Sequence, residues 1–308
     1  MNTPVKMPYI PDSQAALAFV TGQRSHIETE VMKREYPEIR YSELIPVDTS
    51  AADFAPSVTF FSQDHTGKAK FINGKGNDVP LVNLTRTKFE QTVNMGGIGY
   101  EFSLEEIGAA QQMNINLSNE GAEAARQAYE QHVDEVAFLG ETELGVEGLL
   151  NMTGINSVAA TGVFTGTTLT AQQILADING QITAVHASTL GIDMIDTLLM
   201  PLQVYGDLAT RQLAPESDTT IMDFIQRKNM YTVSTGRPLT IAGTHRLTDT
   251  MVMYKRDPKV VKMHMPMPLR FIAPQAIGLS ITTLGMYRFA PVNIRRPGAF
   301  RYLTGVAA

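Results

Sequence analysis

The sequence predicts an α+β protein, in which helices and strands occupy largely separate stretches of the chain. Three observations support this class. Two extended stretches flank a cluster of turn formers between 57 and 95, a long helical pattern follows over 103–140, and the last part, 251–308, is rich in strand-like segments. Because only 155–250 alternates helices with strands, we expect one mixed α/β unit with its own core inside this larger frame.

Composition places the chain among ordinary globular proteins. Of its 308 residues, 44% are hydrophobic and 18% are charged, and the formal net charge of −6 gives no overall sign of nucleic-acid binding. Cysteine is absent, which excludes disulfides and thiolate sites and fits a reducing cytoplasm. Residues 1–11 do not resemble a signal peptide, and no apolar run approaches the roughly 18 residues of a membrane helix. We therefore expect a soluble protein with no membrane partner.

The first 56 residues are rich in proline and hold too few apolar residues for a core of their own. We expect a short helix over 12–21, capped by Asp12, and an extended course from Ile39 to Thr49. This arm is expected to lie on something else.

A ribbon of two strands is predicted next, over 58–72 and 79–95, around the turn formers of 73–78. Alternation places Arg86 and Lys88 on one face of the second strand, and neither face is apolar enough to be buried in a core. A ribbon that is polar on both faces is weakly held by its own domain, and it makes physical sense if it protrudes and lies on a neighbouring subunit.

Helices follow the ribbon. Residues 96–99, Gly-Gly-Ile-Gly, are interpreted as a flexible joint, because they do not form a dinucleotide fingerprint. Ser103 and Glu106 fit a capping box, and a second helix runs from about 118 to 139, with Gly140 as its left-handed cap. The small or apolar stripe of this second helix consists of Ala122, Ala125, Tyr129, Val133 and Val136.

The mixed unit begins with a helix capped by Thr170. The other expected elements are a strand over 194–200, a helix opened by Pro201, a helix over 218–228, and strands over 239–242 and 250–254.

The end of the chain is cationic. Between 251 and 308 the only acidic residue is Asp257, whereas the basic residues are Lys255, Arg256, Lys259, Lys262, Arg270, Arg288, Arg295, Arg296 and Arg301. This tail has three possible roles: a solvated face, a surface facing phosphates, or a set of salt bridges between subunits. Arg295 and Arg296 are the better contact candidates, because arginine pairs bidentately with carboxylate or phosphate.

No catalytic, metal or cofactor pattern is found. The six histidines show no HExxH spacing, and the chain has no GxSxG elbow and no phosphate-binding GxxxxGK[ST] loop. We therefore expect no enzyme and no cofactor. An α/β enzyme is kept as a third hypothesis, since 31 acidic residues offer many carboxylate pairs.

The C-terminal residues resemble the end of tailed-phage major capsid proteins, above all a prophage-borne branch of about this length. The matching stretches are Met-Pro-Met-Pro-Leu-Arg (265–270), Pro-Gln (274–275), Gly-Leu (278–279), Val-Asn-Ile-Arg-Arg-Pro-Gly-Ala (292–299) and Tyr-Leu-Thr-Gly (302–305). The connector Gly-Val-Glu-Gly-Leu-Leu-Asn (145–151) is a second matching point. The order of parts is similar to the Hong Kong 97-type capsid fold, which encapsulin shells share, from about residue 30 onward.

This resemblance implies five parts: an N-terminal arm (1–56), an extended β-hairpin loop (57–98), a peripheral domain with a long spine helix (99–154), an axial α/β domain (155–254) and return strands of both domains (255–308). It implies a major capsid protein of a virion, assembled in the host bacterial cytoplasm. Copies would form hexamers and pentamers of an icosahedral shell that encloses double-stranded DNA through non-specific contacts. Separate scaffolding, portal or decoration proteins are expected, and any N-terminal scaffolding region is expected to be separate or cleaved off.

The expected inter-subunit contacts are cations of the loop and the tail: Lys68, Lys70, Lys75, Arg86, Lys88, Arg295 and Arg296. Some relatives crosslink a loop lysine to an asparagine of a neighbour, for which Lys68, Lys70, Lys75 and Asn293 are the residues present; plain solvated lysines are the simpler interpretation. The alternative function is an encapsulin-like shell that packages an enzyme, and the material that co-purifies distinguishes the two.

Overall fold

The computed structural model describes residues 36–71, 79–113, 117–166, 169–214 and 216–307. The chain divides into two units, Met1–Glu38 and Ile39–Ala308, and every helix and strand of the described residues belongs to the second. The helices are α2 (Tyr41–Leu44), α3 (Leu104–Met113), α4 (Leu117–Leu139), α5 (Ala171–Ser188), α6 (Leu202–Thr210), α7 (Ile221–Lys228), α8 (Met230–Thr235) and the 3-10 helix η1 (Pro297–Ala299).

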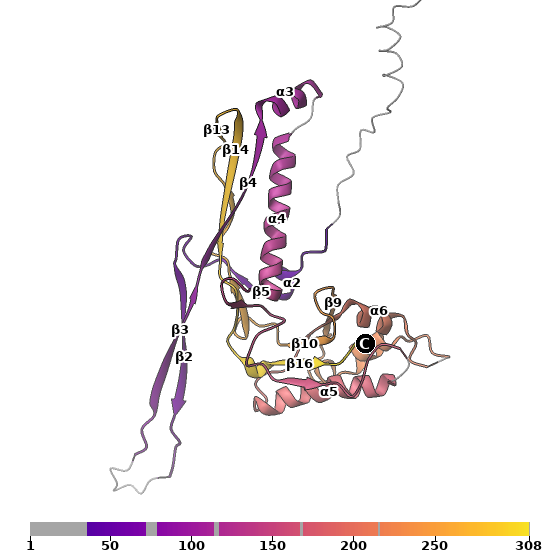
Figure 1. Ribbon diagram of the computed structural model, residues 1–308. Helices are drawn as coiled ribbons and strands as arrows, with labels where there is room; N and C mark the ends of the chain where they lie inside the picture. Colours follow the sequence, from indigo (N-terminus) through magenta and orange to yellow (C-terminus); the bar gives the residue numbers. More distant parts are fainter. Residues whose placement is uncertain (1–35, 72–78, 114–116, 167–168, 215, 308) are drawn as a thin grey trace, which may run out of the picture. The chain divides into compact units, whose positions relative to one another are not determined.

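The strands are distributed over five sheets. They are β1 (Val47–Asp48), β2 (Ser57–Thr66), β3 (Asn83–Thr92), β4 (Asn94–Ser103), β5 (Gly140–Glu141), β6 (Val146–Glu147), β7 (Ser157–Ala159), β8 (Thr197–Pro201), β9 (Thr240–Thr244), β10 (Thr250–Tyr254), β11 (Val261–His264), β12 (Met267–Phe271), β13 (Gln275–Ile277), β14 (Ser280–Phe289), β15 (Val292–Ile294) and β16 (Phe300–Thr304). The cationic tail contributes strands to three of these sheets (Figure 1).

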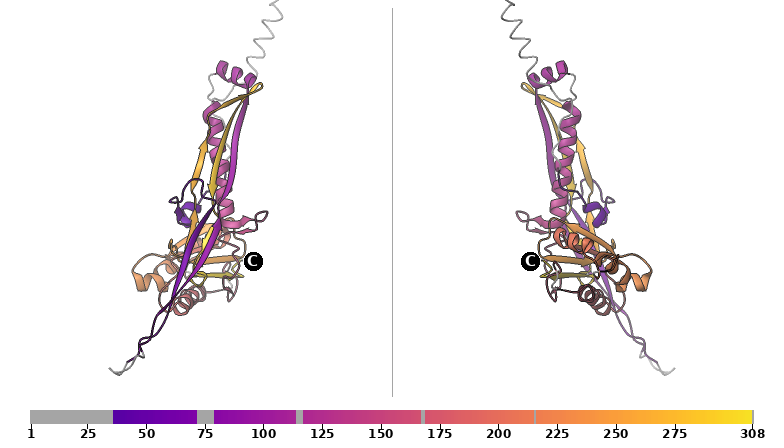
Figure 2. Two further views of the ribbon diagram at one scale, coloured as in Figure 1. Left: turned by 90° about the vertical axis from the view of Figure 1, so that its left-hand side faces the viewer. Right: turned by 90° about the vertical axis from the view of Figure 1, so that its right-hand side faces the viewer.

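The long helix α4 lies along an antiparallel sheet in which β14 pairs with β12, β13 and β4. Both views of Figure 2 show the magenta helix beside the golden strands. The helix approaches the sheet closely at Gly121, where a Cβ atom would lie 2.8 Å from the rings of Tyr100 and Phe102. The absence of a side chain at Gly121 therefore permits this packing distance.

The helical predictions for this region are confirmed. Ser103 Oγ accepts from the N–H of Glu106 at 3.1 Å, and the Glu106 carboxylate accepts from the N–H of Ser103 at 2.8 Å, which completes the capping box. The predicted stripe of α4 is buried at Ala125, Tyr129, Val133 and Val136, and half-buried at Ala122. Gly140 ends the helix with φ of 76°.

The interpretation of residues 96–99 as a flexible joint is wrong. These residues belong to β4, which pairs with β14 over ten consecutive residues. A Cβ atom on Gly96 would run into the ring of Tyr287, and one on Gly99 would lie 2.6 Å from the carbonyl oxygen of Thr283. The glycines are required by close packing across the sheet, which a sequence cannot distinguish from flexibility.

The prediction that the chain is extended from Ile39 to Thr49 is wrong in part, because α2 interrupts it. The carboxylate of Asp134 in α4 accepts hydrogen bonds from the N–H groups of Arg40 and Tyr41, at 2.9 and 3.0 Å. These are the free donors at the start of a helix, and here a side chain 93 positions away satisfies them. The predicted helix over 12–21 lies outside the described residues.

The ribbon is confirmed as β2 paired with β3 over ten residues, from Ser57 opposite Thr92 to Thr66 opposite Asn83. Each strand pairs only with the other in the described part of the chain. Most of its residues are exposed on both faces, as the polar pattern predicted. Figure 1 shows no helix over either face.

The mixed unit is a five-stranded sheet of order β7-β16-β10-β8-β9, and α5 packs on it through Ile174, Ile178, Ile182 and Val185. Thr170 caps α5 in a capping box, as predicted. Pro201 precedes α6 as its N-cap, and α7 begins at Ile221 after a cap by Thr220, slightly later than predicted.

This sheet separates two hydrophobic cores. Val252, Tyr254, Phe300 and Tyr302 face the core shared with α4 and the arm. Met251, Met253 and Leu303, the alternate residues of the same strands, face the core under α5.

Candidate functional site

The root of the ribbon is fixed to the cationic tail. The rings of Phe60 and Phe89 stack at 5.2 Å between centroids, and the guanidinium of Arg295 lies 4.6 Å from the centroid of Phe60. The amide of Gln91 donates to the carbonyl oxygen of Pro291 at 2.6 Å. Arg295, predicted as a contact between subunits, therefore has a contact within the chain that positions the ribbon.

Beyond the root, the three charged residues of β3 lie on one exposed face. Lys88 pairs with Glu90 at 2.9 Å, and the Nε of Arg86 donates to Gln63 at 3.2 Å. The hydroxyl of Ser57 and then the ammonium of Lys88 lower the pKa of the Glu90 carboxyl. Arg86 and Lys88 remain exposed and available to a neighbouring surface.

The outer end of the ribbon combines charge with apolar surface. Lys68 and Lys70 line a shallow hollow of 260 Å³ together with Val79, Leu81 and Val82. The third predicted loop lysine, Lys75, lies outside the described residues. An exposed hollow with apolar walls and two lysines suits contact with an acidic, partly apolar surface.

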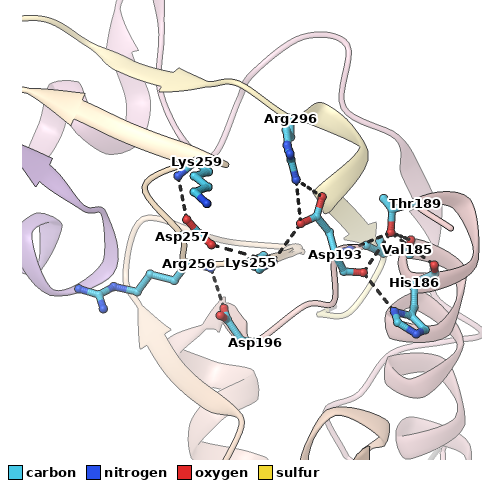
Figure 3. Close-up of polar contacts among 10 residues, drawn as sticks. All are labelled: Val185, His186, Thr189, Asp193, Asp196, Lys255, Arg256, Asp257, Lys259 and Arg296. Atoms are coloured by element: carbon cyan, nitrogen blue, oxygen red, sulfur yellow. Dashed lines mark hydrogen bonds and ion pairs between the residues drawn. The ribbon is translucent and has the colours of Figure 1, made fainter. Parts of the chain in front are cut away.

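Arg296 has its partner within the chain. Asp193, whose side chain is only 4% exposed, accepts from Arg296 at 3.1 Å and from Lys255 at 3.0 Å. Figure 3 shows the Asp193 carboxylate between the two cations. The same loop holds Asp196, which accepts from the N–H of Arg256 at 2.7 Å and whose pKa is raised by burial.

Two more tail cations, Lys262 and Arg270, pair with acidic residues of the same chain. Lys262 pairs with Asp48 of the arm at 2.7 Å, and this contact, followed by the bonds from Ser50, holds the pKa of Asp48 well below its usual range. Arg270 pairs with Asp53. Four of the nine tail cations are thus paired with aspartates of the same chain, a fourth possibility beside the three that the sequence suggested. The partners were missed because they lie far away in sequence and come from the arm or the loop before β8.

A pocket of 240 Å³ lies where the end of α4 meets β4 and the β5–β6 hairpin. Its walls include His132, Phe289 and Pro291, and its rim carries Glu141 and Glu143. The pocket is open and acidic, so it does not resemble an anion or nucleotide site.

Among the described residues, no group of three histidine or acidic side chains could hold a metal ion. In the same part of the chain, no helix is both long and apolar enough to cross a membrane. These surfaces can bind and pack, and their geometry assigns no chemical step.

The fold is similar to several solved shells. The capsid of Myoviridae phage XM1 has a TM-score of 0.77 at 20% identity, with 97% of this chain and 100% of that chain covered. The capsid of an empty GTA particle has a TM-score of 0.65 at 9% identity, with 97% and 100% covered. A virus-like particle from Pyrococcus furiosus has a lower TM-score of 0.53 at 12% identity, with 94% and 96% covered.

These likenesses confirm the predicted Hong Kong 97-type capsid fold. No curated protein matches the chain. A family model described as major capsid protein matches residues 67–306, most of the chain. The chain therefore belongs to the major capsid protein family.

Proposed function

We propose that copies of this chain assemble as hexamers and pentamers into an icosahedral shell around double-stranded DNA. Membership of the capsid family supports the shell, and the single structural observation that carries self-assembly is the ribbon. Its strands are exposed on both faces along most of their length, and a two-stranded ribbon is marginal in water unless something covers it. A neighbouring copy in a closed lattice supplies that cover.

The contact residues follow from where the ribbon carries charge. Lys68 and Lys70 at its outer part, with Arg86 and Lys88 behind them, form a cationic surface, and the predicted contact residue Lys75 follows Lys70 in the sequence. Residues 99–154 contain eleven acidic residues and one basic residue, Arg126. We place the ribbon of one copy on this acidic region of the next, where many weak contacts add up over the lattice. Arg295 and Arg296 would act indirectly, by orienting the segments that make the contacts.

The DNA would be held through non-specific contacts with phosphates. Four of the nine tail cations pair with aspartates of the same chain; among the others, Arg256 and Lys259 are exposed and are candidates for such contacts. The protein belongs to the virion as a capsid subunit, and we propose that assembly takes place in the host bacterial cytoplasm with separate scaffolding, portal or decoration proteins. No enzymatic role is proposed.

Expression of the full chain followed by negative-stain microscopy and nuclease treatment tests this function. Closed particles that protect DNA are expected when packaging partners are present. A co-purifying protein in place of DNA would favour the encapsulin-like alternative, and monomers at high protein concentration would contradict both.

The ribbon contact has its own test. The variant Lys68→Glu/Lys70→Glu is expected to form fewer particles while its thermal unfolding stays unchanged, because the ribbon lies outside both cores. Particle yields equal to those of the unmodified protein would contradict the proposed contact.

A further inference from the structure

The side chain of Arg301 is buried without a counter-ion. It lies in β16 and is 9% exposed. Its Nε is enclosed without a hydrogen-bond acceptor, and within the described residues its guanidinium forms neither a hydrogen bond nor an ion pair. Of its three nitrogen atoms only Nε is fully enclosed, so the two Nη atoms keep a small exposed area.

The surroundings of Arg301 are apolar. The residue opposite it in β10 is Met253, and Leu303 lies two positions further on the same face of the sheet. Both belong to the core under α5. A guanidinium is always charged, and placing it among such groups without a partner is costly.

Other arginines with enclosed, unbonded nitrogen atoms have compensating contacts. Arg211 forms an ion pair with Asp207 at 3.3 Å. Arg288 donates to the carbonyl oxygen of Asp53, and Arg295 stacks on Phe60. Arg301 is thus the exception within the described chain, and its missing partner is expected to come from outside it.

We propose that the counter-ion of Arg301 in the assembled shell is a carboxylate of a second copy of this chain. The proposal rests on the proposed function, since it requires copies to pack side by side. A carboxylate forms two parallel hydrogen bonds with a guanidinium and is small enough to approach a side chain that is only 9% exposed. A nucleic acid requires a broad basic surface, and a single recessed cation does not provide one. The chain also has an excess of acidic residues, 31 against 25 basic residues, so a second copy can supply a carboxylate.

The β5–β6 hairpin of the second copy is the segment that fits. Its turn presents Glu143, which is exposed and has no partner among the described residues, next to Leu144, which is 59% exposed. A turn that carries a carboxylate beside a leucine suits a recessed guanidinium with the apolar neighbours Met253 and Leu303. We therefore assign Glu143 as the partner of Arg301.

The substitution Arg301→Met separates this role from a purely structural one. It removes an unpaired buried charge and keeps the apolar stem, so the melting temperature of unassembled subunits is expected to rise by about 2 °C or more. Particle formation is expected to need an about tenfold higher protein concentration, because the contact between copies is lost. The matched control, Arg246→Met, removes a half-buried arginine that is paired with the buried Asp134 and is expected to lower the melting temperature.

The partner is tested by Glu143→Gln. This variant is expected to shift assembly by a similar factor without changing the melting temperature, and the double variant Arg301→Met/Glu143→Gln should shift it no further. A lower melting temperature for Arg301→Met would place the counter-ion within the chain and overturn the proposal, as would unchanged assembly or additive shifts. If the unmodified protein forms no particles, the proposed function fails, whereas the melting comparison still decides whether Arg301 lacks an internal partner.

Discussion

Replacement of Asp134 is expected to destabilise the subunit more than any exposed ion-pair change. Its side chain is 4% exposed and accepts from Nε and Nη2 of Arg246 at 3.1 and 2.9 Å, as well as from the first two N–H groups of α2. Asp134→Ala leaves the half-buried guanidinium of Arg246 and both N–H groups without this acceptor. Breaking a buried pair in this way costs about 3–5 kcal/mol. For a chain of this size that corresponds to a fall in melting temperature of roughly 10 °C.

Circular dichroism of unassembled subunits during heating measures this effect. The control is Asp223→Ala, which removes an ion pair with Arg227, whose side chain is 71% exposed, and is expected to cost about 0–1 kcal/mol. The double variant Asp134→Leu/Arg246→Met should recover part of the loss, because it leaves no unpaired charge. Equal losses for Asp134→Ala and Asp223→Ala would refute the reasoning, since burial would then not matter.

Two further predictions concern β4 and the arm. Gly96→Ala should lower the free energy of unfolding by about 1–3 kcal/mol, because the new Cβ atom meets the ring of Tyr287. The control is Gly108→Ala in α3, where no atom lies near the new Cβ, and this variant should be neutral or slightly stabilising. Urea unfolding of the two variants measures the difference. The depressed pKa of Asp48 means that, in acid, the folded chain binds fewer protons than the unfolded chain. The stability that this carboxylate contributes is therefore present in full above about pH 4 and is lost as the pH falls further below that value. Urea midpoints between pH 7 and pH 3 should therefore fall more steeply for the unmodified protein than for Asp48→Asn, and parallel curves would show that the pair with Lys262 contributes nothing.

Local patterns predicted the parts of the fold that local physics determines. The apolar spacing of α4 and the caps of α3 and α5 depend on residues within one or two turns, and the structure has them where they were expected. The ribbon was predicted because its turn formers and its polar alternation are read over a few residues. The prediction for the Gly-Gly-Ile-Gly segment was wrong because the role of its glycines depends on Tyr287 and Thr283, which lie in a strand almost 200 positions later.

The buried charges could not be predicted for the same reason. Asp134 stands beside Val133 on the apolar stripe of α4, and an acidic residue on a buried stripe is the one signal that could have marked it. Its partners Arg40 and Arg246 are 94 and 112 positions away. Asp193, which holds Lys255 and Arg296, gives no such signal, because it lies in a loop where an exposed carboxylate is the usual expectation.

These internal pairs change which charges are available for assembly. A sequence count gives a tail with nine basic residues and suggests a surface for nucleic acid, but Lys255, Lys262, Arg270 and Arg296 are held by aspartates of the same chain. Their charges hold the arm, the tail and the loop before β8 together, so they stabilise the subunit rather than the shell. The charges that a neighbouring copy can reach are Lys68 and Lys70 at the outer end of the ribbon, the exposed carboxylates of 99–154 and the recessed Arg301. The first two are opposite in sign and Arg301 lacks an anion within the described residues, so a second copy is the partner that we propose for each.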